Sequence, residues 1–274
     1  MSDPFTHGHE MYYKIKELQD STNNMVTAGF STRYGGVSQK PFRSLNLGLH
    51  VKDIDHNVID NRRRLAESID TQLDQWVFAD QVHGSDICKV EQTDKGKGSK
   101  SLESGIIGMD GLYTRERGLV LALAYADCVP IFFLSEESHI VGIAHAGWKG
   151  SVRGIAARMV DTWVTNEEVA VDSIHVFVGP SIQECCYEVD QRVISQVDDS
   201  LDDEDPRPYT AKGNSKYQLN LQRLNKQLLM RAGVPEKNVH LTKLCTSCNV
   251  DRFFSHRKEN GATGRMLGFI MLEQ

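Results

Sequence analysis

Three segments of the sequence share one design, in which an apolar run ends in a side chain that can bind a metal ion. The segments are FADQVHG, LAYADCVP and GIAHAGWKG, and the side chains are those of His83, Cys128 and His145. Two imidazoles and one thiolate suit Zn²⁺, and three protein ligands leave the fourth tetrahedral position open for water or substrate. A catalytic zinc site is therefore one interpretation of the three residues, which their spacing alone does not favour over packed side chains. Packed, hydrogen-bonded side chains are the alternative, because separations of 45 and 17 residues match no local metal motif.

Asp127 directly precedes Cys128 and is the only charged residue in its apolar run. A carboxylate at this place is predicted to orient a metal ligand or to act as a general base. A carboxylate that caps a turn is the alternative. Because adjacent residues of a strand point to opposite faces, Asp127 shares a pocket with Cys128 only if the strand ends before Cys128.

Two glycine-bearing segments offer donors for an anion. Ser31 and Arg33 lie in FSTRYGG, and Lys149 lies in GWKG, which is expected to open a helix. Together they predict a phosphate site, since cationic and amide donors hold an oxyanion without a dedicated P-loop. Tight turns with solvated cations are the alternative. No Walker or Rossmann motif occurs.

Near the C-terminus, the segment FFSHR places His256 and Arg257 after an aromatic pair. We predict that the segment forms a substrate wall in which Arg257 binds substrate. His256 is the alternative to Asp127 as the proton carrier. A salt-bridged strand end is the competing interpretation.

Four further cysteines form a vicinal pair, Cys185-Cys186, and a single C-x-x-C motif, Cys245 to Cys248. A four-thiolate zinc site is one interpretation of this set. Buried thiols are favoured, because structural sites usually draw on two C-x-x-C units and adjacent cysteines point poorly toward one metal.

Short apolar runs and helical spacing predict the elements that position these residues. Strands are predicted at Val26–Phe30, Trp76–Val82, Leu119–Ala126, Ile131–Leu134, Ile140–Ala144, Ile174–Val178 and Met266–Ile270. Helices are predicted around Ile54/Val58/Leu65/Ile69, Ile155/Met159/Trp163 and Leu221/Leu224/Leu228, the last ending at Gly233. Strands and helices do not alternate strictly, so we predict an α/β fold of α+β-like character with mixed sheets.

No repeat or linker divides the chain, and one domain is predicted over residues 1–274, with residues 1–25 as an N-terminal extension. The extension is expected to be disordered around His7 and His9, an H-x-H pair that could bind copper adventitiously. Two polar segments, Thr93–Ser104 and Asp198–Pro208, are predicted to be solvated surface insertions.

Charge and composition exclude several classes of function. The chain has 31 Lys and Arg against 37 Asp and Glu, a net charge of −6, which disfavours nucleic acid as a partner. The longest apolar stretch, Gly118–Leu134, is interrupted by polar residues and is too short to cross a membrane. The start of the chain has no basic region followed by an apolar one, so a cytoplasmic location with reduced cysteines is expected.

Ten motifs in order resemble those of the YfiH/YlmD family, also catalogued as polyphenol oxidase or laccase-domain proteins, and the YlmD branch is the most similar. The motifs are GFSTRYGGVS, PFRSLNLGLHV, NRRRL, QVHG, DGLYT, ADCVPIFF, AHAGWKG, GPSIQECCYEV, CTSC and FFSHRKENGATGR. The resemblance implies sheets packed between helical layers and zinc on His83, Cys128 and His145. It also implies phosphorolysis of adenosine, inosine, guanosine and methylthioadenosine, together with adenosine deaminase activity.

Other functions compete with the one that the resemblance implies. A multicopper laccase is disfavoured, because it needs several paired histidine ligand sets and this chain has one H-x-H; adventitious Cu²⁺ at the triad is still expected to compete with zinc. A metal-free cysteine hydrolase or amidase would use Cys128 as nucleophile on a peptidoglycan precursor. A non-enzymatic module would use zinc only for stability. The sequence sets neither the preferred nucleoside nor the oligomeric state.

Overall fold

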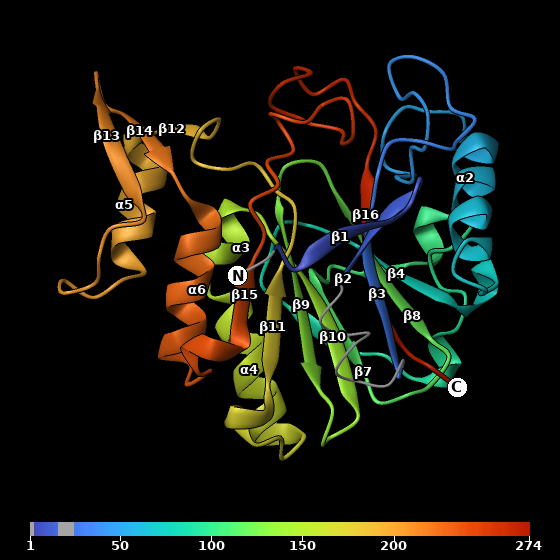
Figure 1. The fold of residues 1–274 in the computed structure, drawn as a ribbon, viewed down its shortest axis with the longest axis horizontal. Helices are drawn as coiled ribbons and strands as arrows, with labels where there is room; N and C mark the ends of the chain where they lie inside the picture. The colour runs from blue at the N-terminus through green and yellow to red at the C-terminus, as the bar shows by residue number, and fades with distance from the viewer. Residues whose placement is uncertain (1–2, 16–24) are drawn as a thin grey trace.

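The computed structural model describes residues 3–15 and 25–274, and its strands form two large mixed sheets and one small sheet (Figure 1). The first sheet has the order β1 (Phe5–His9), β2 (Tyr12–Ile15), β3 (Val26–Ser31), β16 (Met266–Leu272), β8 (Val120–Tyr125), β4 (Trp76–Asp80), β6 (Ile106–Ile107). The second has the order β15 (Val239–Leu241), β11 (His175–Val178), β9 (Val129–Ser135), β10 (Ile140–Ala146), β7 (Gly111–Thr114), β5 (Ile87–Lys89). The small sheet has the order β12 (Glu188–Asp190), β14 (Lys216–Leu219), β13 (Tyr209–Gly213). The described helices are α2 (Asp55–Glu67), α3 (Trp148–Val152), α4 (Ile155–Asn166), α5 (Gln191–Asp199) and α6 (Leu221–Arg231).

The two large sheets pack face to face, and helices cover their outer faces (Figure 1). Phe30 of the first sheet and Phe132 of the second share one buried cluster. On the outer face of the second sheet, Phe133 packs against Trp163 of α4. On the outer face of the first sheet, Leu65 of α2 joins a separate cluster. The predicted α/β fold, with mixed sheets between helical layers, is confirmed.

Each predicted strand and helix is present, because each carries a clear apolar pattern. The elements so predicted are β3, β4, β8, β9, β10, β11 and β16, and helices α2, α4 and α6. Gly233, where α6 was expected to end, has a φ of 96°, a conformation that favours glycine. The short strands β5, β6, β7, β12, β13, β14 and β15 and helix α5 carry weaker patterns, and the sequence does not predict them. Within the described residues, no helix has the length and apolar character to cross a membrane.

The expectation of a disordered terminus around His7 and His9 is wrong. β1 pairs with β2 and β2 pairs with β3, so these residues extend the first sheet. The buried side chain of Phe5 anchors the hairpin against Phe132, with ring centroids 5.8 Å apart. Residues 1–2 and 16–24 of the predicted extension lie outside the described residues.

The segment Thr93–Ser104 is not a purely solvated insertion. The carbonyl oxygens of Gly98 and Ser99 accept hydrogen bonds of 2.7 and 3.0 Å from the buried Arg62 guanidinium. This inward-facing arginine fixes the segment on α2, which apolar patterning alone does not indicate. Asp198–Pro208 is exposed or half-exposed apart from its buried Leu201 and Pro208.

The sheet topology brings three chain turns to one edge. β4 and β8 run parallel, so their ends lie side by side. β9 and β10 run antiparallel, and Val129 at the start of β9 faces Ala146 at the end of β10. The loop after β4, the turn between β8 and β9, and the end of β10 therefore meet.

Candidate metal centre and cavity

His83, Cys128 and His145 meet at this edge of the sheets. One ligand atom from each residue lies within 4.8 Å of the others, and the two imidazole rings are nearly perpendicular, with centroids 4.8 Å apart. Ligand atoms around one tetrahedral Zn²⁺ are about 3.3–3.8 Å apart, given zinc–sulfur and zinc–nitrogen bonds of about 2.3 and 2.0 Å. The structure thus brings together the three predicted ligands, and their donor set of two imidazoles and one thiolate fits a single zinc ion.

Asp110 holds two of these three residues, and sequence reasoning missed it. Its carboxylate is completely buried, and Oδ1 accepts a 3.1 Å hydrogen bond from the His83 backbone N–H. The same oxygen accepts from His145 Nδ1 at 2.8 Å, which leaves Nε2 of that ring for a metal. Oδ2 accepts from the N–H groups of Val82 and Gly84 at 3.1 and 2.6 Å. The motif DGLYT begins with Asp110 and is the feature of the sequence that could have identified this residue.

Cys128 and His145 shift each other's pKa in opposite directions. Burial raises the pKa of the Cys128 thiol, but His145 and His83 outweigh burial and lower this pKa to about 6. Burial lowers the pKa of His145, but Cys128 and Asp110 outweigh it and raise this pKa to about 9. At neutral pH the two groups are therefore a thiolate and an imidazolium, and a metal ion bound here displaces the imidazolium proton.

We expect the number of protons released on zinc binding to depend on pH. Between about pH 6 and 9 the Cys128 thiol is already ionised, so His145 supplies the displaced proton. Below about pH 6 the thiol proton must also leave, so zinc affinity rises with pH and rises more steeply in the acid range. Calorimetry in buffers of different ionisation enthalpy measures this number, with the Cys128→Ala chain titrated in parallel to subtract other sites. If the number of protons released on zinc binding were the same above and below about pH 6, the expected titration of Cys128 and His145 would be contradicted.

Gly147 has no side chain, and the candidate ligands Cys128 and His83 occupy the space where a side chain would lie. A Cβ atom at this position would lie 3.0 Å from Cys128 Sγ and 3.4 Å from His83 Cδ2. We expect Gly147→Ala to weaken zinc binding about tenfold, because it displaces ligands that neighbouring groups have oriented. The free energy of unfolding of the metal-free chain should change by less than about 1 kcal/mol. Zinc titration and thermal unfolding test this, and unchanged zinc affinity would contradict it.

Asp127 lies in the turn between β8 and β9 and has a φ of 83°. Its strand ends at Tyr125, so Asp127 and Cys128 both reach the edge where the cavity opens. Oδ1 accepts from Thr246 Oγ1 at 2.6 Å, while Oδ2 accepts from Ser255 Oγ at 3.0 Å and from the Arg257 backbone N–H at 2.7 Å. The carboxylate therefore holds the segment that carries His256 and Arg257.

A cavity of about 540 Å³ opens beside the three candidate ligands. This volume lies within the range of small-molecule sites. Of the predicted site residues, Lys149, His256 and Arg257 line the cavity together with Asp127. The Arg257 guanidinium donates to the Glu188 carbonyl oxygen at 2.8 Å.

The structure does not bring Ser31 and Arg33 to this cavity, so their predicted place beside Lys149 is corrected. Ser31 is buried, and its Oγ accepts the Leu267 N–H at 2.9 Å. The Arg33 guanidinium pairs with Glu259 at 3.1 Å and lies over the Phe254 ring at 4.5 Å. Arg33 therefore contacts the C-terminal segment and does not line the cavity. Motif spacing alone could not reveal this position.

Two other arginines, Arg62 and Arg265, line the cavity. Arg62 donates to three backbone carbonyl oxygens, and no carboxylate pairs with it among the described residues. Burial lowers its pKa to about 9. Burial together with the charges of Arg265 and Arg62 lowers the pKa of neighbouring His50 to about 4. This end of the cavity therefore has a positive potential. Arg62 has a sequence signal, because it follows Val58 by four residues on the buried face of α2.

The fold and the metal-ligand cluster place the chain in a known class. It belongs to the family described as multi-copper polyphenol oxidoreductase laccase, whose profile matches residues 27–273. The predicted resemblance to YfiH and YlmD proteins is confirmed.

Two curated relatives and two solved structures illustrate the relationship. The chain is 47% identical over 245 residues to purine nucleoside phosphorylase YlmD of Geobacillus stearothermophilus, covering 89% of each chain. It is 44% identical over 255 residues to purine nucleoside phosphorylase YlmD of Bacillus subtilis, covering 93% of this chain and 91% of that one. The crystal structure of YlmD from G. stearothermophilus matches with a TM-score of 0.96 at 43% identity, covering 100% of both chains. That of the Bacillus licheniformis hypothetical protein YfiH matches with a TM-score of 0.95 at 42% identity, covering 99% of this chain and 100% of that one.

Proposed function

We propose that this protein is a zinc-dependent purine nucleoside phosphorylase whose zinc is held by His83, Cys128 and His145. The observation that carries the proposal is a cavity in which these three candidate ligands lie beside cationic groups that pair with no carboxylate in residues 3–15 and 25–274. The names of the relatives support it. The substrates are adenosine, inosine, guanosine and methylthioadenosine, and adenosine deamination is a second reaction of the same cavity.

Phosphorolysis requires groups that bind phosphate and a group that protonates the departing base. A phosphate oxygen forms a bond to ribose C1′, the bond from C1′ to the purine nitrogen breaks, and its electron pair stays on the base. We assign phosphate to Arg62, Arg265 and Lys149, because cations at a buried surface bind an oxyanion strongly. Zinc, when bound, supplies a Lewis acid and lowers the pKa of a coordinated water.

His256 is the proton carrier in this proposal, and Asp127 is a positioning residue. Both oxygens of Asp127 already accept hydrogen bonds from the segment around His256. His256 is an exposed residue and lines the cavity. An imidazole that lines the cavity can serve as a general acid toward a bound purine. Arg257, whose backbone Asp127 holds, contacts the substrate from the same wall.

The proposal is tested with the zinc-loaded chain and the four nucleosides, each with and without phosphate. We expect release of free base and of the sugar 1-phosphate only when phosphate is present, which is ribose 1-phosphate from three of the nucleosides and 5-methylthioribose 1-phosphate from methylthioadenosine. Adenosine should also yield inosine without phosphate. A zinc-loaded chain that converts none of the four nucleosides would contradict the proposed function.

Phosphate binding should also raise the pKa of His50. An anion beside Arg62 and Arg265 favours the imidazolium form, and an opposite charge at close range shifts a pKa by about 1–3 units. The pKa of His50 should therefore rise from about 4 when phosphate is added, as followed by NMR. Arg265→Gln should reduce both the pKa response to phosphate and the rate of phosphorolysis. If phosphorolysis occurs but phosphate does not change the pKa of His50, phosphate does not bind beside Arg62 and Arg265.

A specific observation also favours a second candidate, a metal-free cysteine hydrolase acting on a peptidoglycan precursor. Cys128, His145 and Asp110 follow the order of a nucleophile, a base and the carboxylate that orients the base. Zinc and this chemistry use the same sulfur atom, so they exclude each other. Hydrolase activity that survives complete removal of zinc would favour the second candidate. A non-enzymatic zinc-stabilised module would instead show no turnover in any state.

A multicopper oxidase is not proposed, although the family description carries that name. The groups in the described part of the chain that could hold a metal are the two histidines with Cys128 and a separate set of four cysteines. Neither set offers the several converging imidazoles that a multicopper centre needs. Copper found at the triad would reflect the high affinity of Cu²⁺ for nitrogen and sulfur ligands.

A further inference from the structure

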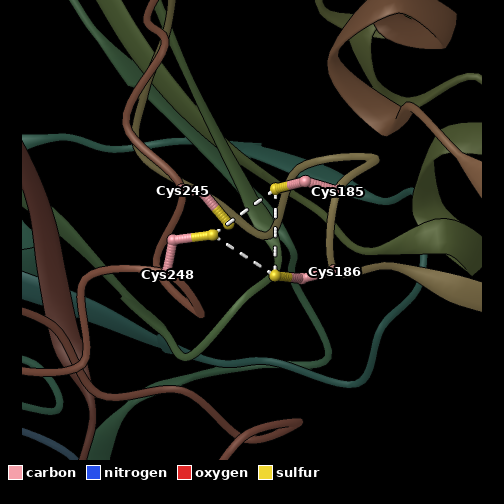
Figure 2. Close-up of side chains that lie close together, drawn as sticks. All are labelled: Cys185, Cys186, Cys245 and Cys248. Carbon is pink, nitrogen blue, oxygen red and sulfur yellow. Dashed lines mark hydrogen bonds between the residues drawn. The ribbon is translucent and has the colours of Figure 1, made fainter.

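Four cysteines converge at a second place, away from the three candidate zinc ligands. Figure 2 shows the side chains of Cys185, Cys186, Cys245 and Cys248 pointing toward one another from two chain segments. Their four sulfur atoms lie within 4.8 Å of one another. The prediction of buried thiols is therefore wrong, because Cys185 and Cys248 are exposed and only Cys245 is buried.

The vicinal pair reaches one point because the chain turns there. The N–H groups of Cys186 and Tyr187 both donate to the Gln183 carbonyl oxygen, at 3.0 and 2.9 Å. In such a helix-like turn successive side chains are about 100° apart, whereas in a strand they point to opposite faces. Adjacent cysteines in such a turn can therefore bind the same metal ion, although the sequence analysis expected adjacent cysteines to point poorly toward one metal.

The spacing of the sulfur atoms matches one shared metal ion. The distances are 3.8 Å from Cys185 to Cys186, 3.5 Å from Cys185 to Cys248 and 3.4 Å from Cys186 to Cys248. Sulfur atoms around tetrahedral zinc are about 3.8 Å apart, whereas a disulfide bond is only about 2.05 Å long. The Gln183 N–H also donates to Cys245 Sγ at 3.4 Å, the kind of contact that stabilises a thiolate ligand.

We propose that Cys185, Cys186, Cys245 and Cys248 form a second metal site that binds one Zn²⁺ through four thiolates. Four protein ligands leave no open position, so this site is structural. Its role follows from the two segments that it joins. The Thr246 N–H donates to the Ser181 carbonyl oxygen at 3.0 Å, which places the segments side by side.

One of the two segments forms part of the cavity wall and the other supports that wall from behind, so the second zinc would hold the wall in place. Ile182 and Tyr187, on either side of the vicinal pair, line the cavity. Thr246, inside the C-x-x-C motif, donates to Asp127, which is adjacent to Cys128. The structural zinc would therefore position the turn that carries Cys128 without contacting substrate.

Metal analysis of four purified chains tests the second site. The wild-type chain, prepared with reductant and without chelator, should carry about two zinc ions, one per site. The Cys185→Ser/Cys248→Ser chain should lose about one, and Cys128→Ala should lose the other. Cys88→Ser is the matched control, because Cys88 belongs to neither group, and it should lose none. A double variant with unchanged zinc content, or iron in place of zinc, would overturn the proposal.

A measurement on the unmodified chain covers the case in which the double variant does not fold. Mass-mapped alkylation should show Cys185 and Cys248 protected in the zinc-loaded protein and reactive after chelation, with Cys88 unchanged. All six cysteines should react in the denatured, chelated chain. Equal reactivity of Cys185 with and without zinc would overturn the proposal. Two cysteines that remain unalkylated in the denatured, chelated chain would indicate a disulfide and would also overturn it. Because the readout is zinc at these cysteines, its failure is distinguishable from failure of the proposed nucleoside activity.

Discussion

Replacing Cys128 with alanine should remove about one zinc ion per chain and reduce phosphorolysis about 10³-fold. The thiolate is the only anionic ligand in the triad, and the remaining two imidazoles cannot hold zinc tightly. Loss of the ion removes several kcal/mol of transition-state stabilisation, and each 1.4 kcal/mol corresponds to about a tenfold change in rate.

The control for Cys128→Ala is Cys88→Ala, a second half-buried cysteine outside the metal-binding groups. It should keep the wild-type zinc content and rate. Metal analysis and the phosphate-dependent release of base are measured on the same preparations. A Cys128→Ala chain that retains wild-type zinc content would remove the basis of the assigned ligand set.

Changes at Asp110 should have the second largest effect, although this residue does not touch the metal. In Asp110→Ala, the backbone N–H groups of Val82, His83 and Gly84 lose their acceptor inside the protein. The Gly84 N–H is buried and the other two are partly buried, and an unsatisfied buried donor costs about 1–3 kcal/mol, so the metal-free chain should lose at least about 1 kcal/mol of unfolding free energy. Zinc affinity should fall about 10–100-fold, because His145 loses the partner that orients its ring.

The Asp110→Asn variant separates orientation from charge. The amide keeps one acceptor oxygen, so the chain should fold, but only Cys128 remains of the two groups, Cys128 and Asp110, that raise the pKa of His145. The His145 pKa should therefore fall toward its ordinary value, while zinc binding stays weaker than in the wild type. Denaturant unfolding, zinc titration and NMR titration measure the three quantities. A wild-type zinc affinity in both variants would mean that Asp110 does not orient the ligand.

The sequence suggests the triad because each ligand lies near or just beyond the end of a strongly apolar strand, and such strands are identified by composition alone. Whether the three turns meet depends on the parallel pairing of β4 with β8 and the antiparallel pairing of β9 with β10, which no local pattern specifies. Asp110 was missed for the same reason. Its contacts with His83 and His145 exist only after the strands have paired.

The phosphate-binding residues show a different limit. Arg33 has the residue type and the glycine-rich context expected of an anion site, but its guanidinium is used by Glu259 and Phe254. Arg62 stands among three consecutive arginines, of which only Arg62 is buried. Helical spacing could have selected it, whereas the place of Arg265 depends on tertiary packing. The cysteine pair was misjudged because its local turn could not be predicted.

The central claim is that zinc at His83, Cys128 and His145 supports phosphorolysis of purine nucleosides. The most direct measurement follows release of free base from inosine with phosphate, using protein whose zinc content is determined before chelation, after chelation and after zinc is restored. The account predicts that activity disappears with the zinc and returns with it in the wild-type chain, but not in Cys128→Ala. Undiminished phosphorolysis by a chain shown to contain no zinc would contradict it.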